Sequence, residues 1–380
     1  MNILFIENNF SPTMGGVERV SFTLGEAFRS NGHQVFYAFR GKDDTFLDSS
    51  CKLKFDDSCS NLDLEKIFET FIVKHQISIV ICQNLHALRY QQIYNVLKRK
   101  CNISIVACLH CNPDIWVNKN KWGHTFAKIY IKELIRTLYF KLLGSSYQKA
   151  QIGMYEISDK YLLLSDSFKP IFCKLNSVDG KKLFAIPNPC PFTEDVKEEA
   201  LQKENSILIV ARMAEQQKRI YESLMIWKAL ALKHTDWNLV VVGDGPDLDK
   251  YKNVVNKEKI NNVKFAGNSS KPQEYYKKAK IFMMTSIWEG LPMTLIEAQH
   301  FGCVPVAYNS FASVKDIITD GKDGYVIPLC DRYEFRQRLS MMMSSPDFLH
   351  GMSQNCLSKN NFNMDNILLK WNELFNIKFV

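Results

Sequence analysis

The chain has 380 residues, which is more than one hydrophobic core usually serves, so two domains of roughly equal size are expected. Its composition, 46% hydrophobic and 23% charged, is that of a folded globular protein and excludes a disordered or fibrous one. The net charge is +8, but no nucleic-acid recognition motif accompanies it.

The chain contains no apolar run of eighteen residues and no N-terminal signal-peptide pattern, so we expect a cytoplasmic protein. Eleven cysteines, an odd number scattered singly, indicate reduced thiols rather than a disulfide framework. The only close pair, Cys108 and Cys111, lacks the second pair that a zinc site would need. We therefore expect no metal.

Short apolar runs alternate with helical stretches, which predicts an α/β protein with parallel sheets. In the first half the runs are 3–6, 35–39, 77–82, 103–109 and 161–164. After the Pro-rich stretch 186–191 the pattern restarts with 207–210, 239–242, 263–265, 281–284 and 304–307. We expect two doubly wound sheets, residues 1–189 and 190–360, that bind a ligand where their strands end.

The first predicted strand is followed by Gly15 and Gly16, which lead into a helix that carries Arg19 one turn later. Paired glycines let main-chain N–H groups approach an anion at a helix start, although they are as often turn residues. In the second half, Arg212 and Lys218 follow the first strand. Two cations on one strand-to-helix loop suit a diphosphate, or else lie in solvent.

The sharpest signal is the segment 288–298, in which two glutamates, Glu289 and Glu297, are eight residues apart. The turn between them and the helix that begins near Met293 offer N–H groups to an anion. This spacing suits a nucleotide sugar, with the sugar hydroxyls at Glu289, the diphosphate at the turn and the ribose at Glu297. The turn residues expected to contact the donor are Gly290, Leu291, Pro292, Met293 and Thr294.

A dinucleotide site is excluded, because the Gly243-Asp244-Gly245 turn has Leu248 where the third glycine of that fingerprint belongs. The stretch 113–150 contains seven basic and two acidic residues, with aromatic residues interleaved among them. This composition is typical of a helix on an anionic membrane surface, and equally of an ordinary solvated helix face.

Taken in order, the paired glycines, Arg212 with Lys218, the Gly243 turn and the two glutamates resemble the retaining glycosyltransferases of family 4, which have the GT-B fold. The resemblance covers nearly the whole chain and is most specific at 289–306. Ala211, where the family commonly has glycine, and Pro-Asn-Pro at 187–189, where it usually has Asn-Gly, depart from the pattern.

The resemblance implies a nucleotide diphosphate sugar as donor, with UDP the most frequent carrier, and no cofactor. Arg212 and Lys218 would then stabilise the departing diphosphate, and the base would lie near Phe265. It implies a catalytic role for His110, close to the transferred sugar, and acceptor-side roles for Ser165 and Arg19. Gly15 and Gly16 would approach the diphosphate or the acceptor from the first domain. The last helix, within 361–380, would pack back on the first domain.

We therefore expect a retaining hexosyltransferase that acts on a saccharide acceptor. The basic, aromatic stretch at 113–150 suggests that this acceptor is lipid-linked, at the inner face of a membrane, in surface polysaccharide synthesis. Two alternatives stay open: a GT-B sugar-nucleotide 2-epimerase, and a non-catalytic membrane- or partner-binding protein with the same fold.

Overall fold

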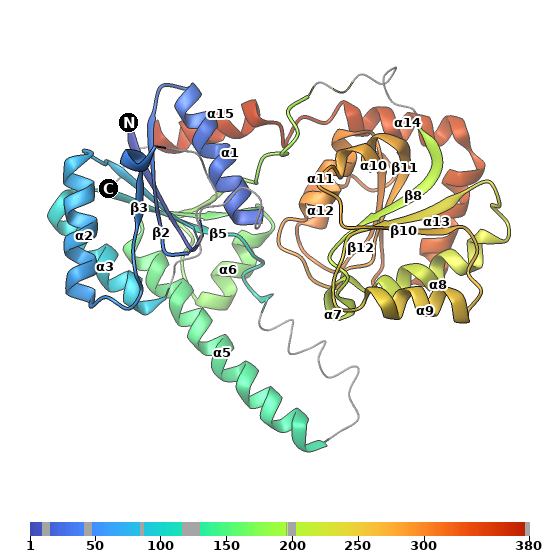
Figure 1. Cartoon of the computed structure of the whole chain (residues 1–380), viewed down its shortest axis with the longest axis horizontal. Coiled ribbons are helices and arrows are strands. Elements are labelled where there is room, and N and C mark those ends of the chain that lie inside the picture. The colour runs from blue at the N-terminus through green and yellow to red at the C-terminus, as the bar shows by residue number, and fades with distance from the viewer. Residues whose placement is uncertain are drawn as a thin grey trace. The chain divides into compact units, whose positions relative to one another are not determined.

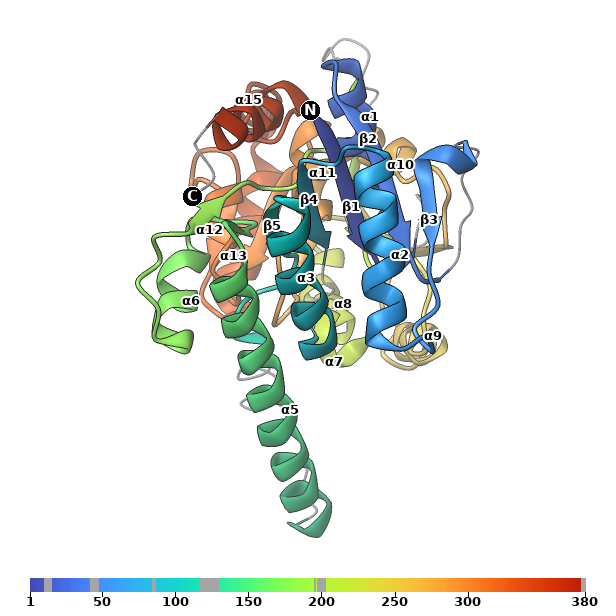
Figure 2. The same ribbon diagram turned by 90° about the vertical axis from the view of Figure 1, so that its left-hand side faces the viewer.

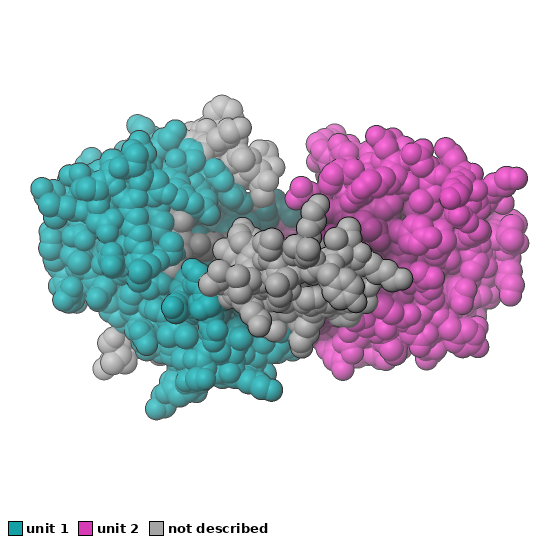
Figure 3. Space-filling model, turned by 90° about the horizontal axis from the view of Figure 1, so that it is seen from below, with its two compact units in different colours: residues 1–189, 364–380 teal, residues 190–363 magenta. Residues whose placement is uncertain are grey.

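The structure is a computed structural model that describes residues 1–9, 16–41, 48–83, 87–115, 130–194, 196 and 203–376. For residues 130–143 it describes the main chain alone. The chain divides into two compact units, which Figure 3 distinguishes by colour. Unit 1 comprises Met1–Pro189 and Met364–Val380, and unit 2 comprises Cys190–Asn363. Gly15 lies outside the described residues, and so does much of the basic stretch 113–150.

Unit 1 is built on a parallel sheet with the strand order β3-β2-β1-β4-β5-β6-β7. Its strands are β1 Asn2–Glu7, β2 Gln34–Phe39, β3 Lys52–Lys54, β4 Ile79–Gln83, β5 Ser104–Leu109, β6 Lys160–Leu163 and β7 Leu183–Ala185. Its α-helices are α1 Gly16–Ser30, α2 Asn61–Lys74, α3 Leu88–Cys101, α5 Tyr130–Ile157, α6 Phe168–Asn176 and α15 Met364–Asn376.

The helices of unit 1 cover both faces of this sheet (Figures 1 and 2). The residues of α1 and α15 share one apolar core with β1, β2, β4 and β5. Phe28 of α1 contacts two aromatic rings of α15, Trp371 at 5.4 Å and Phe375 at 5.5 Å between ring centroids. The C-terminal helix therefore belongs to the core of the N-terminal unit.

Unit 2 is built on a second parallel sheet, with the order β10-β9-β8-β11-β12-β13. Its strands are β8 Glu204–Val210, β9 Asn238–Val242, β10 Val263–Gly267, β11 Ala279–Met284, β12 Val304–Tyr308 and β13 Tyr325–Ile327. Its helices are α7 Glu215–Lys218, α8 Ile220–Ala231, α9 Leu248–Lys257, α10 Gln273–Lys278, α11 Met293–His300, α12 Val314–Ile317, α13 Arg332–Ser344 and α14 Pro346–Leu357.

The main core of unit 2 lies between its strands and α8, α9, α13 and α14. Trp227 of α8 is fully buried there, and its indole N–H donates to the carbonyl of Asn261 at 2.9 Å. On α10, Tyr276 packs against Phe282 of β11 and against Phe301, with ring centroids 5.9 Å and 6.1 Å away. The prediction of two parallel α/β sheets is thus confirmed.

Both sheets reverse their strand order beside the first strand, between β1 and β4 in unit 1 and between β8 and β11 in unit 2. Loops that leave two neighbouring strands at such a point diverge to opposite faces of the sheet, which opens space for a ligand. In unit 2 the loop after β8 carries Arg212 and Lys218, and the loop after β11 carries Glu289. The candidate residues therefore occupy the favourable edge of that sheet.

Candidate functional site

The strongest feature of unit 2 is an ion pair between two predicted site residues. The Nζ of Lys218 lies 2.6 Å from Oε1 of Glu289, although 71 positions separate the two residues in sequence. Both side chains are largely buried, with 19% and 9% of their surface exposed. The fold thus unites the cation predicted for the diphosphate with the carboxylate predicted for the sugar.

Lys218 ends the short helix α7, and the next residue, Arg219, adopts a left-handed conformation at φ 52°. This conformation costs about 1 kcal/mol or more for a residue other than glycine, so the surroundings must stabilise it. The hydroxyl of Thr285, which follows β11, donates to the carbonyls of Lys218 and Arg219 at 3.1 and 2.9 Å. These bonds fasten the loop after β8 to the end of β11.

Arg219 lies between two carboxylates, Glu215 at 3.6 Å and Glu222 at 3.8 Å. Burial raises the pKa of Glu215, an effect that hydrogen bonds from the main-chain N–H of Tyr221 and from the hydroxyl of Tyr251 oppose. Burial would also raise the pKa of Glu222, but Arg332 outweighs it and lowers that pKa. The loop is thus supported by charged groups that sequence analysis did not single out.

The turn from Glu289 to Pro292 leads directly into α11, and Pro292 provides no side-chain cap for that helix. The N–H groups of Met293 and Thr294 find no acceptor among the described residues. Ser313 steadies the turn, because its hydroxyl donates to the carbonyl of Gly290 at 2.5 Å. An uncapped helix start with outward N–H groups suits an anion such as a diphosphate.

Three other predicted donor contacts have different surroundings. The side chain of Arg212 is exposed and forms no ion pair within the described part of the chain. Glu297 is buried at 3% exposure, and it accepts a hydrogen bond of 2.9 Å from the hydroxyl of Tyr276. Phe265 on β10 is partly buried and packs against the main core of unit 2. Sequence analysis missed the contact from Tyr276, because nothing in its sequence neighbourhood marks it.

The Gly243 turn has a packing role. A Cβ at Gly243 would lie 1.9 Å from the carbonyl oxygen of Ala211, and one at Gly245 would lie 2.6 Å from that of Met213. The two loops are also joined by a hydrogen bond of 2.9 Å from the N–H of Met213 to the carbonyl of Asp244. These glycines therefore let the loop after β9 pack against the loop that carries Arg212.

In unit 1, His110 follows β5, and its Nε2 forms a hydrogen bond with Oε1 of Gln83 at the end of β4. Gln83 is 1% exposed and was not identified from the sequence. Gly16 begins α1, where an added Cβ would meet no atom within 4 Å, and Arg19 is partly buried three residues later. Ser165 is buried, and its hydroxyl accepts from the N–H of Ser167 at 3.1 Å, which suits a local turn.

The described part of the chain has neither a disulfide nor a cluster of metal ligands. All eleven cysteines lie in the described ranges, and none forms a disulfide. The Sγ of Cys111 lies 2.7 Å from the hydroxyl of Tyr147, and burial raises the pKa of Cys108 well above its ordinary value. Within the residues that the structure describes, no three His, Cys, Asp or Glu side chains gather as metal ligands would.

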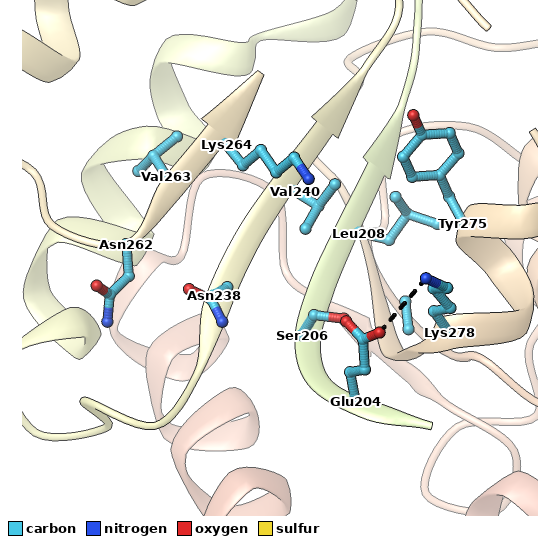
Figure 4. Close-up of a pocket in the computed structure, with 11 residues that line it drawn as sticks. Glu204, Ser206, Leu208, Asn238, Val240, Asn262, Val263, Lys264, Tyr275 and Lys278 are labelled. Carbon is cyan, nitrogen blue, oxygen red and sulfur yellow. Dashed lines mark ion pairs between the residues drawn. The ribbon is translucent and has the colours of Figure 1, made fainter. Parts of the chain in front are cut away.

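Unit 2 also has a hollow of about 360 Å³ at the amino ends of its strands (Figure 4), opposite to the strand ends that lead to the candidate residues. Its lining includes Glu204, Asn238 and Val263, the first residues of β8, β9 and β10. Glu204 forms an ion pair of 3.6 Å with Lys278 there. Because ligands of open α/β sheets bind at the carboxyl ends of the strands, this hollow is not part of the candidate site.

Comparison with known proteins finds a family match within unit 2. Residues 191–358 match the model of glycosyl transferases group 1. The chain is 26% identical over 240 residues to an amylovoran biosynthesis glycosyltransferase of Erwinia amylovora. This match covers 61% of this chain and 66% of that protein. It is 27% identical over 242 residues to an Escherichia coli UDP-Gal:alpha-D-GlcNAc-diphosphoundecaprenol alpha-1,3-galactosyltransferase, 57% of this chain and 60% of that protein.

Solved structures extend the likeness over the whole chain. The HepE protein of Anabaena, solved in complex with UDP, is 13% identical and covers 99% of each chain with a TM-score of 0.73. A lipopolysaccharide outer core galactosyltransferase, WaaB, is 18% identical and covers 99% of each chain with a TM-score of 0.69. At these identities the structures demonstrate the shared GT-B fold. The sequence match assigns residues 191–358 to the glycosyl transferases group 1, and the whole chain shares the fold of these structures.

Proposed function

We propose that this glycosyltransferase moves a hexose from a UDP-sugar to a lipid-linked saccharide, with retention of configuration, in the synthesis of a surface polysaccharide. The observation that carries the proposal is the contact of Lys218 with Glu289 beside the uncapped start of α11. A cation, a helix start and a carboxylate meet there, which are the three groups that a sugar diphosphate needs. The UDP in HepE and the donor in the E. coli relative's name support the choice of nucleotide.

In this proposal the groups of unit 2 hold the donor. Lys218, the exposed Arg212 and the first N–H groups of α11 stabilise the diphosphate as its negative charge grows. Glu289 accepts hydrogen bonds from hydroxyls of the transferred sugar. Glu297 binds the ribose through the carboxylate that Tyr276 orients, and the base lies near Phe265.

The reaction proceeds on one face of the sugar. The bond from the anomeric carbon to the diphosphate oxygen breaks, and an acceptor oxygen bonds from the same side. The acceptor proton passes to the departing phosphate oxygen, so no enzymic nucleophile is needed. Binding and charge stabilisation then account for most of the rate. Gly15 and Gly16 are proposed to contact the donor, His110 to act near the transferred sugar, and Arg19 and Ser165 to serve the acceptor.

A thermal-shift screen of nucleotide sugars tests the donor. A ligand that binds the folded state raises the melting temperature, by an amount equivalent to about 2.7 kcal/mol at a hundredfold excess over its Kd. We expect UDP-sugars to raise it and GDP-sugars to leave it unchanged. Stabilisation by a GDP-sugar alone would overturn the choice of donor. Isomerisation of the donor without an acceptor would instead indicate an epimerase, and binding without any turnover a non-catalytic protein.

The lipid-linked acceptor is proposed from the stretch 113–150 and from the diphosphoundecaprenol in the relative's name. No helix in the described part of the chain is both long and apolar enough to cross a bilayer. The 28-residue helix α5 extends away from the sheet of unit 1 (Figures 1 and 2), and its residues 130–150 belong to the basic stretch. We propose that this region contacts an anionic membrane surface at its cytoplasmic face.

Co-sedimentation with phosphatidylglycerol vesicles at low salt tests this contact. We expect binding that weakens as salt rises, because screening shortens the reach of the basic charges. Substitution of Lys132, Arg136 and Lys141 by glutamine should reduce binding, while transfer to a soluble acceptor continues. If the wild-type protein transfers sugar but stays in the supernatant at low salt, membrane contact is ruled out.

A further inference from the structure

The carboxylate of Glu289 is held through both of its oxygens by two consecutive residues. Lys218 contacts Oε1 at 2.6 Å, and the side-chain amide of Gln217 donates to Oε2 at 3.3 Å. Glu289 is itself 8% exposed. Its carboxylate is therefore oriented by the loop after β8 before any donor arrives.

Gln217 is fastened to the turn that carries Glu289 at two further points. Its side-chain amide nitrogen also donates to the carbonyl of Trp288 at 3.1 Å, and its main-chain carbonyl accepts from the N–H of Ile287 at 2.9 Å. The two hydrogens of the amide thus have two acceptors on adjacent residues. Both the side chain and the main chain of Gln217 are tied to residues 287–289.

The two partners of Glu289 differ in what a donor does to them. Lys218 is a mobile point charge that a diphosphate attracts, so donor binding draws it from Glu289 toward the phosphates. The amide of Gln217 is neutral, so a diphosphate does not draw it away from Glu289. Once Lys218 turns away, Gln217 is the described side chain that still bonds to the Glu289 carboxylate.

We propose that Gln217 is a positioning residue, which keeps the Glu289 carboxylate directed at the hydroxyls of the transferred sugar while Lys218 binds the diphosphate. The inference rests on the proposed function of this site and adds a residue to it. Because Gln217 acts through Glu289, its loss affects recognition of the sugar and leaves recognition of the nucleotide intact.

The chain offers a matched pair of variants for the test. Gln217→Met keeps the length of the side chain and removes its amide, and Gln216→Met makes the same change at the exposed neighbouring residue. The measurements are kcat and KM for the UDP-sugar, and the melting temperature with UDP alone and with the UDP-sugar. We expect Gln217→Met to lower kcat about 10- to 100-fold, the size of effect that misplacement of a positioning group produces.

In the same variant UDP should raise the melting temperature as it does in the wild type, and the additional rise that the sugar gives should disappear. Gln216→Met should match the wild type in every measurement. In a Glu289→Ala background, which leaves no side-chain oxygen to position, Gln217→Met should cause no further loss of kcat. An additive loss there, or an unchanged kcat in the single variant, would overturn the inference.

The outcomes also separate this inference from the proposed function. If the wild type responds to UDP-sugars and transfers sugar while Gln217→Met behaves as the wild type, the inference fails and the proposed function stands. If Gln217→Met weakens UDP and UDP-sugar equally, Gln217 supports the loop as a whole and the positioning role is refuted. If the wild type responds to no UDP-sugar, both fail together.

Discussion

At the scale of single residues, Lys218 and Glu289 neutralise each other while the donor is absent. Lys218 must leave Glu289, or share its charge, to bind a diphosphate. Part of the attraction between cation and phosphate is therefore offset by the loss of the existing, largely buried ion pair. On the proposed function, the free energy of donor binding includes this competition.

Glu289→Gln should therefore separate binding from turnover. Removing the charge releases Lys218, so we expect UDP to bind about 2- to 10-fold more tightly, while sugar transfer falls severely. Isothermal titration with UDP and a transfer assay measure the two effects. Asp244→Asn, which removes an exposed carboxylate of a neighbouring loop, controls for charge in general. Weaker UDP binding in Glu289→Gln would contradict this account of the pair.

A second residue-scale feature is the buried carboxyl of Glu7, at the end of β1 in unit 1. It is 1% exposed, and among the described residues neither of its oxygens has a hydrogen-bond partner. Burial raises the pKa of Glu7 well above its ordinary value, an effect that the nearby Ser21 opposes and Glu18 reinforces. In the described part of the chain the hydroxyl of Ser21 donates to the carbonyl of Val17 at 3.0 Å.

The sign of the resulting pH dependence follows from linkage. Below pH 4.5, the ordinary pKa of this carboxyl, Glu7 is protonated in both the folded and the unfolded chain, so its burial costs no ionisation free energy. As pH rises, Glu7 ionises readily in the unfolded chain alone, so the folded state loses stability. Glu7→Gln should thus raise the melting temperature at pH 7 and leave it unchanged at pH 4. Each unit of raised pKa corresponds to about 1.4 kcal/mol. Glu65→Gln on α2 is the control, and equal effects at both pH values would contradict the prediction.

At the scale of elements, one buried carboxylate joins α8, β12 and α13. Glu222 of α8 accepts two hydrogen bonds of 2.6 Å from Arg332 and one of 3.0 Å from the hydroxyl of Tyr308. Because α8 begins directly after Arg219, this arrangement also fixes the helix that follows Lys218. The loop after β8 is thus supported by a helix that the sequence pattern does not connect with it.

Arg332→Met tests this connection. It leaves Glu222 with fewer donors, and we expect a loss of about 1–3 kcal/mol, toward the lower end because Arg332 is partly exposed. The loss should be larger at pH 7 than at pH 4, since the pKa of Glu222 is lowered in the fold and the carboxyl can protonate in acid. Urea unfolding at both pH values measures it. Arg336→Met on the same helix should have little effect, and a loss independent of pH would argue against a charge-based role.

At the scale of the whole molecule, the chain leaves unit 1 after Pro189 and returns to it at Met364. The returning helix α15 buries Ile367, Leu368, Trp371, Leu374 and Phe375. The stability of the N-terminal unit therefore depends on the last residues of the chain, whereas unit 2 is continuous in sequence. The two units should respond to different substitutions.

Trp371→Ala should lower the stability of unit 1 selectively. Truncation of a buried tryptophan costs about 3–5 kcal/mol, which lowers a melting temperature on the order of 10 °C for a unit of this size. Calorimetry with and without UDP separates the units, because on the proposed function UDP raises the transition of unit 2. Leu369→Ala, at a position of the same helix with 59% exposure, is the control. A UDP-responsive transition that fell by the same amount would contradict independent stability of the units.

Sequence reasoning reached most of the fold, because buried parallel strands leave continuous apolar runs that are easy to recognise. It missed β3, β7 and β13, which are three-residue strands at the edges of the sheets, too short to leave a run. It also located the start of α11 at Met293, where a proline and a glycine precede the helix. Strand ends differed by only a few residues.

The sequence by itself determined the two α/β sheets and the segments that supply charge, since each follows from local pattern and spacing, and its motifs carried the resemblance to a family. Only the tertiary structure decided which side chains meet the two carboxylates: Lys218 and Gln217 contact Glu289, and Tyr276 contacts Glu297. The physical reason is that these partners lie 71, 72 and 21 positions apart. Their contacts arise from the pairing of β8 with β11 and the packing of α10 beside α11, which no local pattern encodes.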